Sequence, residues 1–145
     1  MASHVEHLLR TIEILQQALD AIGVEIHDPT SVRFDLFRNA AIKSFEISIE
    51  TAGKLICKAL REFAGTPRAI DALVFNELLR AAGKHGLMSL DEVERWLRYR
   101  ANRNSTAHDY GVGFANETLA LLPAFIVDAR ALAAALQRLL DERAG

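Results

Sequence analysis

Residues 98–111, RYRANRNSTAHDYG, gather three arginines, one histidine and two tyrosines in a chain whose formal net charge is −2. Arginine is suited to binding phosphate, because its planar guanidinium donates several hydrogen bonds from one rigid fork. Histidine takes up and releases protons near neutral pH, as cleavage of a phosphodiester by the RNA 2′-hydroxyl requires. Arg103 and His108 are therefore the candidate pair for chemistry on a phosphodiester.

The spacing of this pair sets a condition on the helix that carries it. In an unbroken helix of about 3.6 residues per turn, side chains five positions apart point roughly 140° away from each other. Arg103 and His108 can converge only if the helix ends near Thr106, or if a second subunit completes the site. The alternative without chemistry is a solvated helix end, in which an arginine pairs with Glu94 and His108 caps carbonyl groups.

Length and composition favour one helical domain, spanning residues 1–145. Half of the 145 residues are hydrophobic and 25% are charged, while the 8 glycines and 3 prolines are few, which favours helix. The single cysteine, Cys57, cannot form an internal disulfide, and the N-terminus lacks the pattern of a signal peptide. No continuous apolar run approaches the ~18 residues that span a bilayer. We therefore expect a cytoplasmic protein without a membrane segment.

Apolar residues at helical spacing predict an all-α, up-and-down bundle of about five helices. The first two are expected over residues 3–22 and 30–64. The third starts with Thr66 as cap and Pro67 at its first position, and continues to the glycines at 83 and 86. We expect its buried stripe to consist of Ile70, Leu73, Val74 and Leu78.

The fourth and fifth helices flank the arginine-rich segment. The fourth opens with SLDE, in which Ser89 and Glu92 predict a capping box. The fifth is expected over about 117–142, and Pro123 predicts either a later start or a kink. The residues of the fourth helix that we expect to face the core are Leu90, Val93, Leu97 and Ala101.

The second helix carries a charged face with two glutamates one turn apart. Glu46 and Glu50 can be interpreted as a catalytic carboxylate pair, or as part of a solvated face in which Glu50 pairs with Lys54. We favour the solvated face. Gly53, inside the same helix, costs roughly 1 kcal/mol relative to alanine, which a close contact with another helix would explain.

Other candidate residues have plainer interpretations. His4 and His7 can share a metal only with a third ligand, and a surface pair is the simpler interpretation. Trp96 and Tyr99 are able to stack on bases, but Trp96 is better explained as an anchor in the core or in an interface. Cys57 lies among lysines and is expected to be a partly buried thiol.

The motif and its surroundings resemble one family. RNSTAHDY, residues 103–110, is similar to the R-x4-H-x-Y motif of the HEPN superfamily, particularly the HepT-like toxins of MNT–HEPN toxin–antitoxin systems, formerly called nucleotidyltransferase substrate-binding proteins. The segments SFEISIETAGKLICKAL and GTPRAIDALVFNELLRAAGKHGLMSLDEVERWL resemble the second helix and the middle of that family. The resemblance covers roughly residues 34–140. Gly53 departs from it, because relatives often carry a bulky aromatic residue there, and this bears on the local packing.

The resemblance implies an HEPN-like fold and a metal-independent endoribonuclease that acts as a homodimer on tRNA or mRNA, without a cofactor. On the matching positions, Arg103 would hold the scissile phosphate and His108 would transfer the proton. Asn104 would position the phosphate or the histidine. In such dimers the two motifs lie near the interface and form one cleft. The long apolar stripes of the second and fifth helices also favour a homodimer.

The same resemblance implies a partner that controls the activity. Tyr110 matches the tyrosine to which the cognate MNT-type nucleotidyltransferase, the antitoxin, transfers AMP. The added phosphate and purine would occupy the place of the RNA phosphate. One alternative is a non-catalytic subunit that binds substrate for the nucleotidyltransferase, and another is a dimeric helical scaffold. The presence of Arg103, His108 and Tyr110 together favours the ribonuclease.

Overall fold

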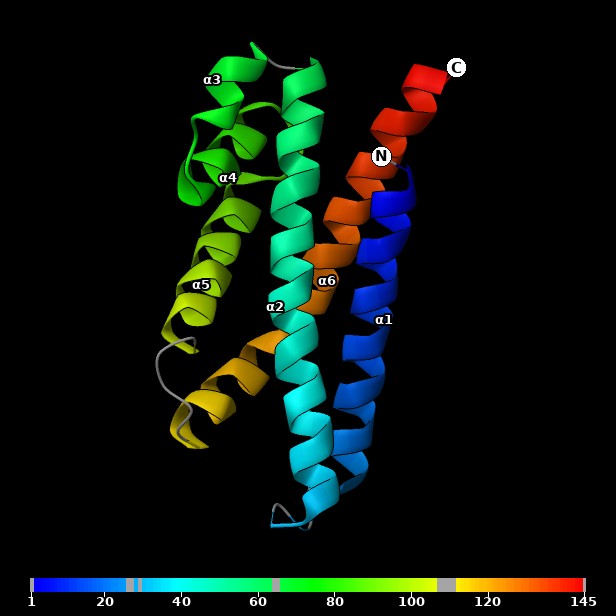
Figure 1. Ribbon diagram of the computed structural model, residues 1–145, viewed down its shortest axis with the longest axis vertical. Coiled ribbons are helices and arrows are strands. Elements are labelled where there is room, and N and C mark those ends of the chain that lie inside the picture. Colours follow the sequence, from blue (N-terminus) through cyan, green and yellow to red (C-terminus); the bar gives the residue numbers. More distant parts are fainter. Residues whose placement is uncertain (1, 26–27, 29, 64–65, 107–111, 145) are drawn as a thin grey trace.

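The computed structural model describes residues 2–25, 28, 30–63, 66–106 and 112–144. These residues form helices and connecting turns, with no strand among them, so the expected all-α class is confirmed. The chain runs down α1, up α2, down α5 and up α6, as an up-and-down bundle requires (Figure 1). The helices in the described ranges are α1 (Ala2–Glu25), α2 (Val32–Phe63), α3 (Pro67–Asp71), α4 (Phe75–Lys84), α5 (Leu90–Thr106) and α6 (Val112–Ala144).

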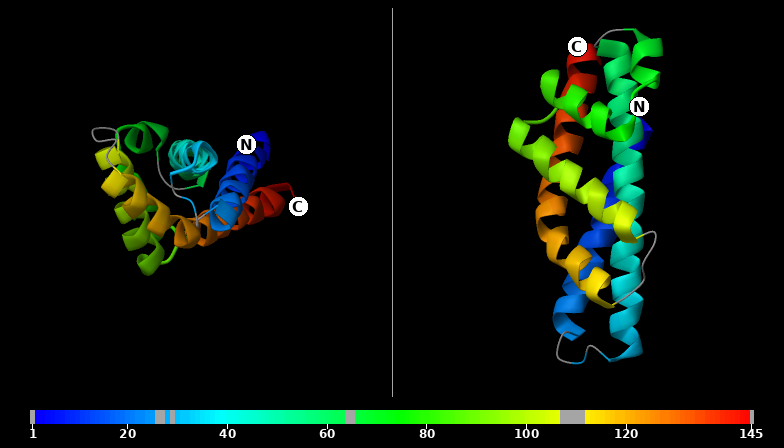
Figure 2. Two further views of the ribbon diagram at one scale, coloured as in Figure 1. Left: turned by 90° about the horizontal axis from the view of Figure 1, so that it is seen from below. Right: turned by 90° about the vertical axis from the view of Figure 1, so that its left-hand side faces the viewer.

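The long helix α2 lies at the centre of the bundle. It packs against α1 and α6 on one side and against α3, α4 and α5 on the other (Figures 1 and 2). Its apolar stripe is buried, and the ring of Phe45 meets the ring of Phe125 on α6 edge to face, with centroids 4.9 Å apart. The buried residues of the α2 stripe are Phe45, Ile49, Ala52, Ile56 and Ala59.

This burial changes what the apolar stripes mean for assembly. The stripe of α2 and the residues Leu122, Phe125 and Leu132 of α6 are covered by the chain's own helices. The two stripes therefore give no argument for a dimer interface, and the homodimer itself stays a prediction. The core of one chain accounts for them, because apolar area removed from water stabilises each buried side chain by about 1.5–3 kcal/mol.

The segment that we expected to form the third helix is divided into α3 and α4. Thr66 caps α3 as expected, with its hydroxyl accepting a hydrogen bond from the backbone N–H of Ala69 at 3.3 Å. Helix α3 then ends at Asp71, and α4 begins at Phe75. The residue before it, Val74, is the N-cap of α4, and its N–H donates to the Glu77 carboxylate at 3.1 Å. Val74 was expected to be buried and is 63% exposed. The break turns the chain so that Phe75, instead of Val74, packs against α2.

Helix α5 begins with the expected capping box. The N–H of Ser89 donates to the Glu92 carboxylate at 2.9 Å, and the N–H of Glu92 donates to the Ser89 hydroxyl at 3.1 Å. Val93 is buried as expected, but Leu90 is 79% exposed and Ala101 is also exposed. These two expectations were wrong, because the face of α5 that enters the core runs through its large aromatic residues, Trp96 and Tyr99.

Helix α6 begins at Val112, five residues before the expected start, and continues through Pro123. Its first turns, yellow and light orange in Figure 1, run at an angle to the later ones, so Pro123 produces a kink and not a later start. By length and hydropathy alone, residues 116–142 are apolar enough to cross a membrane, although charged residues interrupt the apolar run. Core packing accounts for this composition, since Leu122 and Phe125 are fully buried.

Candidate functional site

The motif begins in the last turns of α5. The described part of this helix ends at Thr106, so the condition that the helix ends near this residue stays a prediction. Arg103 is partly buried, and Asn104 beside it is exposed. His108 and Tyr110 lie in residues 107–111, outside the described residues, so the convergence of the motif stays a prediction.

Arg103 is held by a carboxylate from a different helix. Its Nη2 donates to Oε1 of Glu50 on α2 at 2.8 Å, across 53 positions of the sequence. We expected Glu50 to pair with Lys54, and it binds the motif arginine instead. Glu46 forms a surface ion pair with Lys43 at 3.9 Å. The two glutamates therefore serve different cations and do not act as a carboxylate pair.

A groove with a volume of about 400 Å³ lies beside Arg103. We call it the α2–α5 groove. Its lining contains three cations and one carboxylate, a formal charge of +2 in a chain whose net charge is −2. Positive charge is thus concentrated next to the motif arginine, as a site for phosphate requires. The groove is lined by Glu50, Gly53, Lys54 and Cys57 of α2, Phe75 of α4, and Arg100 and Arg103 of α5.

One wall of the groove depends on the absence of a side chain at Gly53. A Cβ atom there would lie 2.6 Å from Cε2 of Phe75, closer than two carbon atoms can approach without a shift. The glycine therefore lets the first residue of α4 pack directly on α2, and the close contact that we expected is confirmed. The aromatic ring beside position 53 comes from α4.

Arg100 is positioned at the groove by the same aromatic ring. Its guanidinium carbon lies 4.5 Å from the centroid of the Phe75 ring, a cation–π contact. Arg100 and Arg103 are one turn apart and both line the groove, whereas Trp96 is fully buried in the core. The expectation that Trp96 is an anchor in the core is therefore confirmed.

On its other side, α5 is tied to α6 through a buried carboxylate. Asp128 is 4% exposed, accepts hydrogen bonds from Nε and Nη2 of Arg95 at 2.8 and 2.9 Å, and accepts a third from the Tyr99 hydroxyl at 2.5 Å. Burial and this hydrogen bond raise the pKa of the Tyr99 hydroxyl above its ordinary value. Tyr99 is thus part of the core and does not offer its ring to bases.

A second tie between the same helices lies next to the motif. The hydroxyl of Thr118, fully buried on α6, donates to the Asn102 side-chain oxygen at 2.9 Å. Neither tie was predicted. A signal for the first existed, because Asp128 follows Phe125 by three residues on a strongly apolar helix and a buried carboxylate needs a partner. Arg95 is this partner: it donates to Asp128 and does not pair with Glu94.

The remaining candidates do not form a second reactive centre. No group of three metal-binding side chains occurs within the ranges that the structure describes, which leaves His4 and His7 without a ligand set. The His4 ring lies within hydrogen-bond distance of the Lys58 ammonium, at 3.2 Å, and this positive charge lowers the pKa of His4. The Cys57 thiol is partly buried, as expected, and its pKa is raised by burial and by the nearby Asp71 carboxylate.

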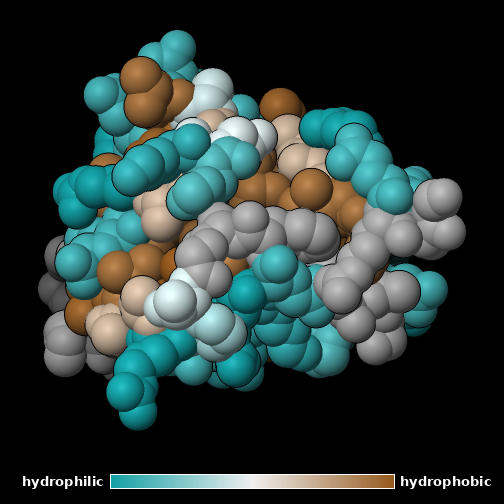
Figure 3. Space-filling model, turned by 90° about the horizontal axis from the view of Figure 1, so that it is seen from above, coloured by the Kyte–Doolittle hydropathy of each residue, from teal (hydrophilic) through white to brown (hydrophobic). Residues whose placement is uncertain are grey.

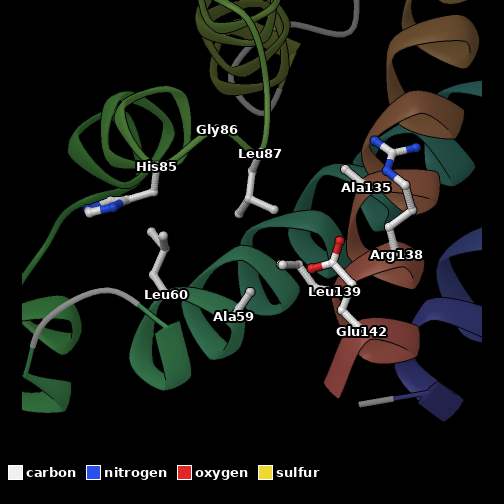
Figure 4. Close-up of a pocket in the computed structure, with 9 residues that line it drawn as sticks. All are labelled: Ala59, Leu60, His85, Gly86, Leu87, Ala135, Arg138, Leu139 and Glu142. Atoms are coloured by element: carbon white, nitrogen blue, oxygen red, sulfur yellow. The ribbon is translucent and has the colours of Figure 1, made fainter. Parts of the chain in front are cut away.

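A second cavity, of about 250 Å³, lies at the upper end of the bundle, beyond the start of α5. Figure 3 shows apolar surface in a hollow at this end, between hydrophilic side chains. Leu60, Leu87 and Leu139 line the cavity together with the polar residues His85, Arg138 and Glu142 (Figure 4). Arg103 is in the last turns of α5, so this cavity is separate from the motif.

The fold and the groove define a class of protein: a helical bundle with a central long α2 and a basic groove beside an arginine near the end of α5. Residues 3–138 match the family described as nucleotidyltransferase substrate binding protein like. Because the match spans most of the chain, this protein belongs to that family, the HepT-like branch of the HEPN superfamily.

Two relatives from Haemophilus influenzae illustrate what the chain is similar to. One is a probable ribonuclease HepT, 29% identical over 126 residues that cover 83% of this chain and 85% of the relative. The other is a solved structure, described as revealing the fold of a substrate binding domain of a nucleotidyltransferase. It matches with a TM-score of 0.78 and 27% identity, and the match covers 92% of this chain and 98% of that one.

Proposed function

We propose that this protein is the ribonuclease toxin of a toxin–antitoxin pair, and that it cleaves RNA without a metal at the motif formed by Arg103, Asn104 and His108. The observation that carries the proposal is the position of Arg103, which lines a groove of positive charge in a protein of net negative charge. Membership of the family and the similarity to a probable ribonuclease HepT give it further support.

The proposed chemistry needs one group that binds phosphate and one that moves protons. Arg103 neutralises the charge that grows on the phosphate oxygens as the RNA 2′-oxygen attacks phosphorus. His108 takes the proton of the 2′-hydroxyl and returns a proton to the leaving 5′-oxygen. The bond from phosphorus to the 5′-oxygen breaks, which leaves a 2′,3′-cyclic phosphate and a 5′-hydroxyl. Asn104, next to Arg103 and exposed, positions the phosphate or the histidine.

Substitution of the motif tests the chemistry. Arg103→Ala and His108→Ala should each abolish RNA cleavage and growth inhibition, and cleavage by the parent should persist in EDTA. The bundle should remain folded by circular dichroism. Arg103→Ala removes an ion pair with Glu50, a side chain that is 52% exposed, and such a pair stabilises a protein by about 1 kcal/mol at most. Arg130→Ala, a change of the same type on the exposed face of α6, is the control.

A second function is favoured by one specific observation. The solved relative is described as having the fold of a substrate binding domain of a nucleotidyltransferase, so a non-catalytic binding subunit is the alternative. The two functions differ at His108, because a protein that only binds has no use for proton transfer. Growth inhibition that is undiminished by His108→Ala would reject the ribonuclease and favour the binding subunit.

We propose that the active form is a homodimer in which two motifs share one cleft. The apolar stripes of α2 and α6 are buried within the chain, so this proposal rests on the resemblance of the motif to the HEPN superfamily. Sedimentation velocity at micromolar concentration measures the assembly directly. A stable monomer that still cleaves RNA would reject the shared cleft.

We further propose that a cognate nucleotidyltransferase silences the protein by transferring AMP from ATP to the hydroxyl of Tyr110, with release of pyrophosphate. The family description supports a nucleotidyltransferase as partner. Catalytic amounts of the partner with ATP and magnesium should add the mass of AMP to the peptide that contains Tyr110. Tyr110→Phe should keep its ribonuclease activity and escape silencing under these conditions.

A further inference from the structure

The α2–α5 groove contains more positive charge than a single scissile phosphate needs. Arg103 is already balanced by Glu50, while Arg100 and Lys54 line the groove beside this pair. Extended RNA carries one negative charge per nucleotide, so a strand bound at Arg103 places another phosphate close by. The two further cations, Arg100 and Lys54, therefore suit a strand with several phosphates better than a single isolated anion.

We propose that Arg100 and Lys54 form a second phosphate-binding site, which holds the RNA strand one nucleotide away from the phosphate at Arg103. The proposal rests on the proposed ribonuclease function and names the part of the substrate that the groove recognises. The occupant is single-stranded RNA, bound through its backbone.

The position of Arg100 fits this role. Arg100 and Arg103 are three residues apart on α5, a spacing that puts their Cβ atoms about 5–6 Å from each other on one face of a helix. The guanidinium carbon of Arg100 lies over the Phe75 ring, 4.5 Å from the ring centroid. Such a cation–π contact leaves N–H donors of the guanidinium available to phosphate oxygens. Phe75 therefore orients Arg100 before RNA binds.

Lys54 faces Arg100 from the opposite wall. It is exposed on α2, one turn beyond Glu50, and its flexible stem lets the ammonium follow a phosphate as a point charge. Glu50 has a different effect, because its carboxylate occupies the guanidinium that the scissile phosphate must reach. Bound RNA has to replace this carboxylate, and the 52% exposure of the Glu50 side chain keeps the exchange easy.

Salt dependence of RNA binding tests the second site, because each contact with a phosphate releases counterions. The probe is a short, fluorescently labelled 2′-O-methyl RNA, which cannot be cleaved because its 2′-oxygen is blocked. Fluorescence anisotropy of the full chain gives its affinity. Arg100→Gln and Lys54→Gln should each weaken binding. For one lost contact with single-stranded RNA, the parent-to-variant ratio of affinities should shrink by about 2.6-fold between 50 and 200 mM salt.

Two control variants separate this role from a general loss of charge or packing. Arg130→Gln makes the same charge change as Arg100→Gln, but on α6, where Arg130 is exposed and pairs with Glu13. It should leave the affinity and its salt dependence unchanged. Phe75→Leu removes the ring under Arg100 without removing a charge. It should weaken binding and keep the salt dependence of the parent.

The outcomes distinguish this proposal from the ribonuclease itself. Salt dependence that is unchanged in both Arg100→Gln and Lys54→Gln overturns the second site, even if the parent cleaves RNA. A parent that binds the probe with the expected salt dependence but cleaves no RNA keeps the second site and rejects the ribonuclease. A parent that fails to bind the probe at low salt overturns the second site as well.

Discussion

Replacing Gly53 with alanine tests how closely α4 packs on α2, and the structure gives the sign of the effect. In an open helix this change stabilises a protein by about 1 kcal/mol, because glycine loses more backbone freedom on folding. At position 53 the new Cβ would lie 2.6 and 3.2 Å from two atoms of the Phe75 ring. The ring has to move, and forcing extra volume into a packed site costs about 1–3 kcal/mol. The net expectation is a loss of about 0–2 kcal/mol in the free energy of unfolding.

The same substitution should change sign when the ring is absent. In a Phe75→Ala background nothing opposes the helix-forming preference of alanine, so Gly53→Ala should stabilise the protein by about 1 kcal/mol. Urea unfolding of the parent, both single variants and the double variant, followed by circular dichroism, gives all four free energies. The coupling between the two positions should be about 1–3 kcal/mol.

Gly23 provides a matched control on α1, since a Cβ atom there would have no neighbour within 4 Å. Gly23→Ala should stabilise the protein, by an amount that does not depend on Phe75. The reasoning is refuted if Gly53→Ala stabilises the parent as much as it stabilises the Phe75→Ala variant. In that case the contact between α4 and α2 is too loose to orient Arg100.

Three further predictions concern single side chains around the site. Tyr99→Phe removes a buried hydrogen bond to the Asp128 carboxylate and should cost about 1.5–3 kcal/mol in urea unfolding. The folded state raises the pKa of Tyr99, so this stabilisation is complete below the ordinary tyrosine pKa of about 10 and is lost as the pH rises through the raised pKa. A stability difference between parent and variant that stays constant in alkaline solution would contradict this expectation. The Cys57 thiol should react with iodoacetamide more slowly than free glutathione at mildly alkaline pH, since burial raises the pKa of the thiol, and the RNA probe should slow this reaction further. Equal reaction rates of Cys57 and glutathione would argue against the burial. Glu50→Gln should tighten binding of the RNA probe, because it removes the carboxylate that competes for Arg103, and weaker binding would instead assign Glu50 to orienting the arginine.

The features of the fold that the sequence predicted correctly are local ones. Ser89 and Glu92 are three residues apart, and the hydrogen bonds between them need no information from the rest of the chain. The same is true of Thr66 as the cap of α3 and of the kink at Pro123. The break before Phe75 escaped prediction, because the apolar spacing there fits one continuous helix. Packing on Gly53, a residue 22 positions earlier, accounts for the break, since it places Phe75 against α2.

The candidate site was predicted only in part, for the same physical reason. The pattern around Arg103 indicated a phosphate-binding arginine, and composition permitted a local basic site. The partner of that arginine is Glu50, 53 residues away, and no local pattern connects the two. Local spacing suggested Lys54 as the partner of Glu50, because residues four positions apart lie on neighbouring turns of one helix, and spacing reveals only such pairs. A contact between two helices, such as this one, depends on how α5 packs against α2, and the spacing of residues along the sequence gives no information about that packing.

The position of Arg103 follows from how α5 is held against α6. Asp128 binds Arg95 and the Tyr99 hydroxyl, and Thr118 binds Asn102 next to the motif, so two polar ties hold α5 on α6. Both ties involve side chains buried on α6, where an unpaired polar group costs about 1–3 kcal/mol, so α5 cannot slide or rotate without leaving one unpaired. The neighbouring face of α5 then presents Arg103 to the groove in a fixed position. A reaction that depends on placing a phosphate within a fraction of an ångström benefits from such a rigid support. Substitutions at Asp128 or Thr118, which are distant in sequence from Arg103, therefore act on the arginine by moving the helix that carries it.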